Sequence, residues 1–340
     1  MSNDIQLITL SNYVSPSVVE TTFLEWVTYG KNNEFYQYII DRHNGSPTNS
    51  SINNSYINMI YGKGLGAHNA KQNQQDWANL QTILKNKDLF NICTDFQIFG
   101  QATFQVIKTK GKKISSIKHV AKQYVLPNVE NEEGEIDRYW FSKDFGKKWD
   151  KKYIPVSYPA FGTSSEAIEI FDVRPYSVGN VYFANPDYYS SLQYSESEEE
   201  ISNLNLNSIK NGLSAGYIIS IKNGKNMDAT DKKAFYDKIK EKLTGSPNAS
   251  RFILSFNGTD VEVEIVPIPQ NENIHKQWEQ LNQTCTSKIL TAHKATSTSL
   301  VGITTSTGFS SNADEMKMAR DILMINSIVP KQNHLLDAFK

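Results

Sequence analysis

Cysteine is scarce in this chain, which has only Cys93 and Cys285 among its 340 residues. The two thiols are far apart and show no CxxC spacing, so neither a disulfide framework nor a zinc site is expected, and a reducing compartment suits them. Both lie in segments with helical patterning, and neither has a base nearby in the sequence. We interpret them as packed helix residues rather than nucleophiles.

Long hydrophobic runs are also lacking. No window approaches the roughly 18 apolar residues that a membrane span needs. The first ten residues, Met1 to Leu10, have neither a basic region nor an apolar run of signal-peptide length. The sequence therefore predicts a soluble protein that is made in the cytoplasm.

An excess of positive charge is missing as well, because 35 Lys and Arg residues oppose 36 Asp and Glu residues, for a net charge of −1. Proteins that bind DNA tightly without reading its sequence usually carry a strong basic surface. The balance does not exclude contact with nucleic acid, but it removes the simple argument for tight phosphate neutralisation.

Motifs for catalysis or cofactor binding do not stand out either. The six histidines show no HxxH, HExxH or HxH spacing, so a metal site is not expected. Gly62-Lys63-Gly64-Leu65-Gly66 lacks the spacing of a phosphate-binding loop and no clear helix follows it. We therefore expect no catalytic residue, no cofactor and no metal ion, and interpret the protein as a non-enzyme.

What is present is a globular composition, with 39% hydrophobic and 21% charged residues, at a length that suits two or three domains. In the first half, apolar residues recur at helical spacing from Pro16 to Ile40 and over Gln74 to Phe96. The polar tract His43 to Asn54 has loop composition, and a short strand is expected at Tyr56 to Ile60. Alternating segments predict further strands at residues 99–107, 114–120, 124–125, 136–141 and 167–171. These patterns indicate an α+β domain with an antiparallel sheet.

The second half reads as two long helices that bracket a small insert. The first helix opens at Asn185-Pro186 and stops at Asn211-Gly212, and the returning helix runs from after Pro269 to about Ala292. Between them the pattern predicts a strand, a helix and two strands, at residues 216–221, 230–243, 252–256 and 261–266. A last helix opens at Asn312, and Pro330 should end or kink it.

Four segments, in this order, resemble the portal proteins of tailed bacteriophages and prophages. Tyr61-Gly62-Lys63-Gly64-Leu65 resembles an element near the start of that family's wing domain, and Phe99-Gly100-Gln101-Ala102-Thr103-Phe104 resembles one of its strands. Asn185-Pro186-Asp187-Tyr188-Tyr189 and the acidic helix after it resemble the entry into the stem. The segment from Ile289 to Pro330, with Leu300 to Ile303 and Gly308 to Glu315, resembles the family's end region.

The resemblance implies an α+β portal-like subunit: an α+β wing domain, two long stem helices bracketing a small β-α-β clip, and a C-terminal helix that returns to the wing. The implied division is a flexible arm (1–15), the wing (16–184), the first stem helix (185–212), the clip (213–268), the second stem helix (269–294), a tunnel-loop region (295–311) and the C-terminal wing helix (312–340). Many relatives continue into a longer C-terminal crown, whereas this sequence stops at Ala338-Phe339-Lys340.

The resemblance also implies partners and a place. The subunits would form a homo-oligomeric ring, most often of twelve, at one vertex of the capsid. Double-stranded DNA would pass through its channel without sequence specificity, driven by a terminase that docks on the clip, and a head-to-tail adaptor would later occupy that face. Capsid and scaffold proteins would surround it. The protein would then be found in the virion, and in the host cytoplasm during assembly.

Acidic residues on the two long helices are candidates for the channel lining, where like charge would repel phosphate. The candidates are Glu196, Glu199, Glu200, Glu272 and Glu279. They fall on more than one helical face, so a solvated helix surface is an equally open interpretation.

Two other sets of residues have a similar double interpretation. Five lysines of the insert helix, Lys232, Lys233, Lys238, Lys240 and Lys242, form either an ordinary mixed-charge surface or a docking face for the motor or adaptor. The nearly uncharged stretch from Thr296 to Thr307 is either an ordinary loop or part of a tunnel loop that closes around DNA. Its candidate residues are Thr298, Ser299, Thr304, Thr305, Ser306 and Thr307.

Two rival functions remain. An α+β hydrolase-like enzyme would need a catalytic constellation that cannot be assembled here without free choice among scattered residues. A monomeric nucleic-acid-binding module would need a strongly basic face, and the net charge argues against it.

Overall fold

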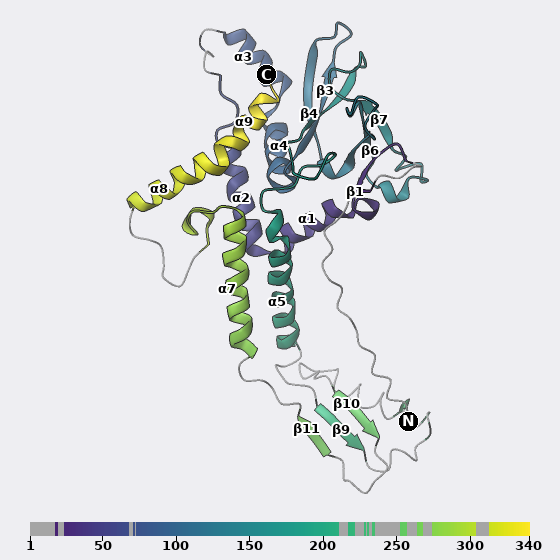
Figure 1. Cartoon of the computed structure of the whole chain (residues 1–340), viewed down its shortest axis with the longest axis vertical. Coiled ribbons are helices and arrows are strands. Elements are labelled where there is room, and N and C mark those ends of the chain that lie inside the picture. The colour runs from purple at the N-terminus through teal and green to yellow at the C-terminus, as the bar shows by residue number, and fades with distance from the viewer. Residues whose placement is uncertain are drawn as a thin grey trace. The chain divides into compact units, whose positions relative to one another are not determined.

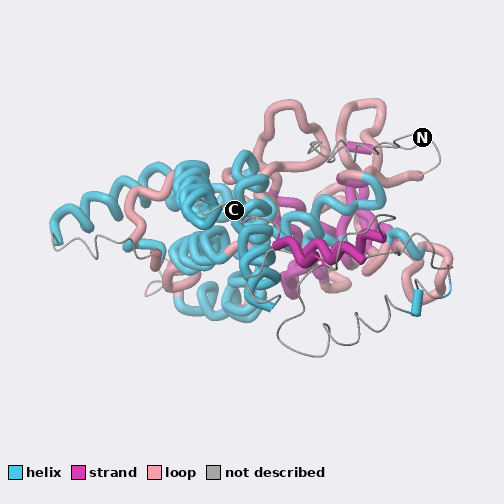
Figure 2. The backbone as a smooth tube through the Cα atoms, turned by 90° about the horizontal axis from the view of Figure 1, so that it is seen from below, coloured by secondary structure: helices cyan, strands magenta, loops and turns pink. Residues whose placement is uncertain are grey.

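The computed structural model describes residues 18–19, 24–67, 71, 73–210, 217–221, 228, 230, 233–234, 252–256, 264–267, 274–303 and 313–340. The chain divides into two compact units. The first contains Met1–Glu196 and Ser287–Lys340, and the second contains Ser197–Thr286. Both helices and strands contribute, as Figure 2 shows by colour, so the predicted α+β class is confirmed.

The first unit begins with a short antiparallel pair, β1 (Val18–Val19) and β2 (Thr28–Tyr29), which is followed by the 3-10 turn η1 (Lys31–Asn33). The helix predicted from Pro16 onward is therefore wrong at residues 18–19 and 24–33, the part before Glu34 that the structure describes. Trp26 forms a bridge with Asn128, and the Val27 amide donates to the carbonyl of Pro127 at 2.9 Å. The apolar residues of this segment are thus buried by an extended chain rather than by a helix face.

Two helices follow, α1 (Glu34–Gly45) and α2 (Pro47–Tyr61). The predicted loop at His43 to Asn54 and the predicted strand at Tyr56 to Ile60 are both wrong, since these residues are helical. Ser46 is the N-cap of α2, its hydroxyl accepts from the Asn49 amide at 3.1 Å, and Pro47 occupies the first turn. Ser before Pro is a helix start signal, which here outweighs the loop-like composition.

The helix predicted over Gln74 to Phe96 is two helices, α3 (Gln74–Ile83) and α4 (Asn86–Phe99). Leu84, which separates them, is extended and buried, and it forms a parallel bridge with Ile117. The pairing of one backbone residue with a strand interrupts an otherwise continuous helical pattern.

Two three-stranded antiparallel sheets complete the body of the first unit. In one, β3 (Ala102–Lys108) lies between β4 (Ile114–Val120) and β8 (Ile168–Val173), with Val106 opposite Ile117 and Phe104 opposite Phe171. The other has β6 (Arg138–Phe141) between β5 (Val125–Pro127) and β7 (Val156–Pro159), with the turns η2 (Lys122–Tyr124) and η3 (Phe145–Lys147) beside it. The sequence predicted these strands except β7, whose Val-Ser-Tyr-Pro pattern is short.

The two largest of three buried clusters in the described residues hold the unit together. The first joins α2, α4 and the sheet around β3 to the end of α7 and the C-terminal helices, through residues such as Ile52, Ile92, Phe104, Ile289 and Leu323. The second is largely aromatic, and the rings of Tyr29 and Phe183 stack in it at 4.6 Å. Burial of such apolar area is the main favourable term in folding.

Beyond the turn η6 (Ser299–Val301), the C-terminal segment contains three helical segments. α8 (Ala313–Leu323) is followed by a π-helical segment, η7 (Met324–Ile328), and by α9 (Val329–Asp337) (Figure 1). Of the predicted end or kink at Pro330, the end is wrong, because helical structure continues through this residue, and the helix is instead irregular directly before it. The wider π turn directly before Pro330 accommodates a residue that cannot donate a backbone hydrogen bond.

The long helices are α5 (Leu192–Lys210), preceded by the turn η4 (Tyr189–Ser191), and α7 (Ile274–Ala292). In the second unit, β9 (Tyr217–Ile221) pairs in parallel with β10 (Phe252–Phe256) and antiparallel with β11 (Glu264–Pro267). A parallel pair needs a crossover connection. Of the helix predicted there, residues 230, 233 and 234 are described and helical, and the others lie outside the described residues.

Candidate functional site

Three of the four segments singled out in the sequence meet in the first unit, at what we call the junction: residues 97–101, 185–187, 293–294 and 326–334. Gly100 ends α4 with φ of 74°, the left-handed region. A Cβ atom there would clash with the backbone carbonyl of Asn185. The side chain of Asn185 in turn accepts a hydrogen bond from the Tyr29 hydroxyl. A glycine is therefore required where the Asn185-Pro186 segment crosses the end of α4.

A chain of buried polar side chains runs through the junction and out along α2. The Nε2 of His293 lies 2.9 Å from the Oδ1 of Asn49, which also accepts from Asn53 at 3.1 Å. Gln97 donates to the Oδ1 of Asn53 at 2.9 Å, and the Nζ of Lys331 donates to the Oε1 of Gln97 at 2.7 Å. Because Asn49 offers a carbonyl oxygen, the network places the His293 proton on Nε2.

His293 follows directly on α7 and is the centre of this packing. Its ring stacks on Tyr188 at 4.4 Å, and its backbone carbonyl accepts from the Tyr56 hydroxyl at 3.0 Å. Burial, followed by the charge of Lys331 and by His43, holds the pKa of His293 well below its usual value. A neutral His293 thus ties the end of α7 to α2 and to the segment that leads into α5.

Lys331 supplies the positive charge of the network. Its ammonium lies 3.2 Å from the carboxylate of Asp187, and its side chain is 11% exposed. Burial lowers the pKa of Lys331, while Asp187 counteracts that shift. The ion pair joins α9 to the Asn185-Pro186-Asp187 segment. The residues of this network were missed in the sequence, where Asn49 and Asn53 looked like loop residues, although their i, i+4 spacing would place them on one helix face.

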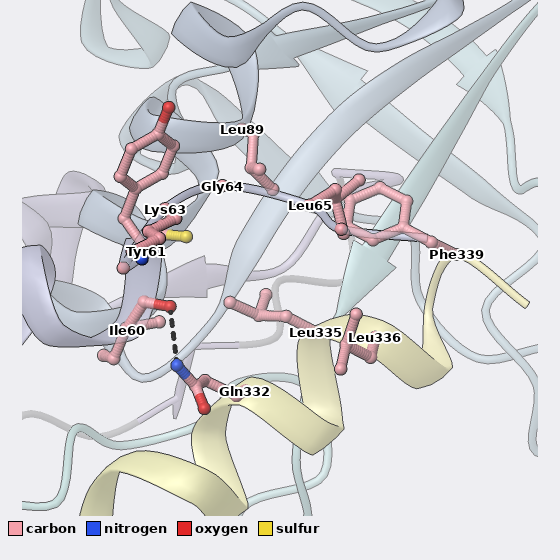
Figure 3. Close-up of a pocket in the computed structure, with 13 residues that line it drawn as sticks. Ile60, Tyr61, Lys63, Gly64, Leu65, Leu89, Gln332, Leu335, Leu336 and Phe339 are labelled. Carbon is pink, nitrogen blue, oxygen red and sulfur yellow. Dashed lines mark hydrogen bonds between the residues drawn. The ribbon is translucent and has the colours of Figure 1, made fainter. Parts of the chain in front are cut away.

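The fourth segment, Tyr61 to Leu65, forms one wall of a pocket of about 260 Å³ (Figure 3). Gln332 on α9 donates to the carbonyls of Met59 and Ile60 at 3.2 and 3.1 Å, and so caps the end of α2. Leu89, Leu335, Leu336 and Phe339 give the pocket an apolar lining. Burial raises the pKa of Cys93, which also lines it, to about 12. Gly62 and Gly64 follow the carboxyl end of α2, where the helix dipole disfavours binding of phosphate. The segment instead contributes to the surface against which α9 packs.

The structure places the acidic candidates of the long helices differently from one another. Glu196 accepts from the Tyr38 hydroxyl at 2.9 Å and pairs with Arg42 at 3.1 Å, with 45% of its side chain exposed. Glu200 and Glu279 are exposed, Glu199 is half-buried, and Glu272 lies outside the described residues. Glu196 is thus bound to side chains of α1, whereas Glu200 and Glu279 are open to solvent. Which of them line a channel stays a prediction.

Within the second unit, the long helices are exposed on almost every side. All described side chains from Ser202 to Asn207 are exposed, including Leu204 at 43% and Leu206 at 48%, and on α7 Leu281 is 46% exposed. Cys285 and Glu198 are buried, and burial and then the Glu198 carboxylate raise the pKa of the Cys285 thiol. Leu204 and Leu206 are two residues apart and therefore lie on different sides of α5, so they do not form a continuous apolar face.

The other candidates are only partly described. Lys233 is exposed, and Lys232, Lys238, Lys240 and Lys242 lie outside the described residues. Thr298 and Ser299 are half-buried in the turn η6, where the Ser51 hydroxyl donates to the carbonyl of Val301. Thr304, Thr305, Ser306 and Thr307 also lie outside the described residues. The docking-face and tunnel-loop assignments stay predictions.

Among the described residues, no group of three or more His, Cys, Asp or Glu side chains is placed to hold a metal ion. Nor does any described helix combine the length and the apolar character of a membrane span.

The sequence matches no model of a known family and no curated protein. The fold, by contrast, is similar to chains in solved structures of gene transfer agent particles. A chain in the virion of a native particle aligns with a TM-score of 0.58 at 10% identity, over 89% of this chain and 79% of that chain. A chain in the neck of an empty particle, computed with C6 symmetry, gives 0.58 at 10% identity, over 90% and 80%.

A third chain, from the neck of a native particle computed with C12 symmetry, aligns with a TM-score of 0.52 at 9% identity, over 88% of this chain and 79% of that one. At these identities the likeness establishes the fold alone. The chain therefore has the fold of a subunit of phage-like particles, and the similarity extends over both units.

Proposed function

We propose that the protein is a portal subunit of a phage-like particle, which assembles into a ring and forms a non-enzymatic channel for double-stranded DNA. The observation that carries this proposal is the fold likeness to neck chains of gene transfer agents, over about nine-tenths of the chain. The order of the four sequence segments supports it independently, because it rests on residues and not on shape.

Ring formation needs two different, complementary surfaces on each subunit, since contacts around a rotational ring are heterologous. The first unit has two exposed apolar sets that are suited to this role. One lies on α8 and the helical turns after it, where Met318, Ile322, Ile325 and Val329 are 66%, 46%, 69% and 38% exposed. The other is the loop with Tyr176 and Val178, which are 88% and 86% exposed. Neighbouring copies would bury both sets.

The long helices would form the channel wall in this proposal. Their exposed leucines, Leu204, Leu206 and Leu281, would contact neighbouring copies, while Glu200 and Glu279 would face DNA. A negative wall repels the phosphates of the duplex, which then passes without being held. The loop that begins at Thr298 would act as the valve.

The chemistry of packaging would belong to partners. A terminase motor and later a head-to-tail adaptor would dock on the second unit, where Lys233 belongs to the proposed docking face, and capsid or scaffold proteins would surround the ring. The work of the portal itself would then be mechanical and electrostatic, in the virion and, during assembly, in the host cytoplasm.

Light scattering on the purified full chain, over a series of concentrations, tests the proposal. A species of about twelve times the monomer mass is expected, with smaller species at low concentration. The two rivals, an α+β hydrolase and a monomeric nucleic-acid-binding module, require no ring. A monomer at every concentration, also in the presence of capsid or scaffold partners, would contradict the portal proposal.

A further inference from the structure

A second pocket, of about 250 Å³, lies at the junction and differs in character from the apolar pocket beside Leu65. The end of α4, the loop at residues 175–187 and the C-terminal helices form its walls. Its polar side chains include Asp187, Lys294, Asn326, Ser327, Lys331 and His334. The packing of the fold accounts for the pair of Lys331 with Asp187 but gives Lys294 and Ser327 no role.

The charges in this pocket do not balance. Lys331 is paired with Asp187, whereas Lys294 forms no ion pair with any residue that the structure describes. The two ammonium groups are close enough to affect each other: burial lowers the pKa of Lys331, Asp187 opposes that shift, and Lys294 adds to it. Two lysines with one carboxylate leave an excess of positive charge in the lining of the pocket, where Lys331 is buried and Lys294 is exposed.

The backbone of Lys294 is a second observation. It adopts φ of 57°, the left-handed conformation that glycine or asparagine normally supplies directly after a helix. A lysine at such a position has an unfavourable backbone conformation, and strain of this kind concentrates where a side chain has a task. Here the residue with this backbone belongs to the lining of the pocket.

A third observation concerns Ser327, which is 3% exposed. Within the described part of the chain, its hydroxyl has no hydrogen-bond partner, although buried hydroxyls are usually bonded. Ser327 and Asn326 belong to the π-helical segment, and π turns occur often at functional sites. A hydroxyl and an amide, both able to donate, thus line the same recess as the unpaired lysine.

We propose that this junction pocket binds a phosphate oxyanion, through the ammonium groups of Lys294 and Lys331 and the hydroxyl of Ser327. A tetrahedral anion offers oxygens to donors in several directions, and ionised partners make the stronger hydrogen bonds. The phosphate could come from two sources, a free phosphate ion or the backbone of a nucleic acid. The inference does not depend on the ring, because every group involved belongs to one copy of the first unit.

The variant Lys294→Gly separates binding from folding. Glycine suits the left-handed backbone, so we expect the variant to unfold at the same temperature as the wild type or higher. Calorimetric titration of the full chain with sodium phosphate, against sodium chloride of equal ionic strength, should show binding that the variant weakens about tenfold or more. Lys112→Gly is the matched control: Lys112 also has a left-handed backbone, with φ of 60°, but lies in a hairpin turn outside the pocket.

The second arm uses a short DNA duplex as the probe and Ser327→Ala as a further variant. If the nucleic-acid backbone is the source, the duplex binds, Lys294→Gly weakens it and phosphate competes. If free phosphate is the source, phosphate alone binds. Two results overturn the inference: the wild type fails to bind phosphate at matched ionic strength, or Lys294→Gly and Ser327→Ala both bind it like the wild type. Light scattering on the same samples reports ring formation separately.

Discussion

At the scale of single residues, Gly100 carries one of the tightest constraints in the first unit. Its left-handed backbone and its contact with the Asn185 carbonyl leave no room for a side chain. Gly100→Ala should lower the free energy of unfolding by about 3 kcal/mol, since it adds a backbone clash to the cost of the left-handed conformation. Thermal and urea unfolding measure the change.

The control for this substitution is Gly134→Ala. Gly134 has a similar φ of 77°, but nothing lies within 4 Å of an added Cβ. Only the conformational cost of about 1 kcal/mol is then expected. Equal losses in the two variants would show that the close approach of Asn185 to Gly100 contributes nothing.

Two histidines, the buried His293 and the half-buried His43, predict a dependence of stability on pH. Burial lowers the pKa of both His293 and His43 in the folded state, while in the unfolded chain each titrates near about 6.5. Below that pH the unfolded state binds more protons, so stability is present above about pH 6.5 and declines as the pH falls, by up to about 1.4 kcal/mol per pH unit for each histidine.

The variant His293→Gln keeps a donor for Asn49 but removes the titrating ring. Between about pH 5 and 6.5, the free energy of unfolding of this variant should then decline less steeply with falling pH than that of the wild type. The difference in slope should correspond to at most one proton taken up on unfolding. His43→Gln removes the contribution of His43 to the pH dependence, so the two variants can be compared with each other. An acid decline as steep as that of the wild type would mean that His293 is not held neutral.

At the scale of elements, one exposed apolar set leads to a prediction about assembly. It lies on α8 and the helical turns after it, and we call it the stripe: Met318, Ile322, Ile325 and Val329. Ile325→Glu places a charge at a position that is 69% exposed in the single chain. Its effect on the unfolding of one copy should be small, about 0.5 kcal/mol or less. In a ring that buries the stripe, the charge would be desolvated, and the ring fraction in light scattering should fall sharply.

Lys317→Glu is the matched control for the stripe, because it introduces the same side chain on the preceding helix, α8, where Lys317 is 68% exposed and pairs with Asp314. We expect it to leave the ring fraction unchanged. If both variants assemble like the wild type, the stripe is not a contact between copies.

The elements also show how far local sequence patterns reach. The strand predicted at residues 114–120 coincides with β4, and strict alternation was enough to find β3. The pattern failed at α2, because Asn49 and Asn53 are polar yet completely buried. Their partners, His293 and Gln97, are distant in the sequence. It failed again at Leu84, where a bridge to Ile117 ends a helix that propensity alone would continue. In both places long-range contacts override local preference.

The same limit applies to the candidate sites. The four segments that resemble portal proteins were visible in the sequence, but the convergence of three of them at the junction was not. The convergence depends on Gly100 admitting the Asn185 backbone and on Lys331 reaching Asp187. Individual stem carboxylates could be named from the sequence, but their differing exposure could not, because it depends on which turn of α5 packs against α1.

At the scale of the whole molecule, the charge of the long helices predicts the behaviour of the ring toward DNA. Rings that carry Glu200→Lys and Glu279→Lys should retain duplex DNA at about 50 mM salt and release it near about 200 mM, as phosphate contacts do. Wild-type rings should retain little in the same gel-shift assay. Glu133→Lys, in an exposed turn of the first unit, is the control. If the charge-reversed rings retain no more DNA than the control, Glu200 and Glu279 do not line the channel.

The central claim is that copies of this chain close into a ring around a channel. Class averages from electron microscopy of the purified full chain test it most directly. The account predicts closed rings with a central hole, with twelve copies as the expected number. Compact particles of one copy, or open filaments without a hole, would contradict it.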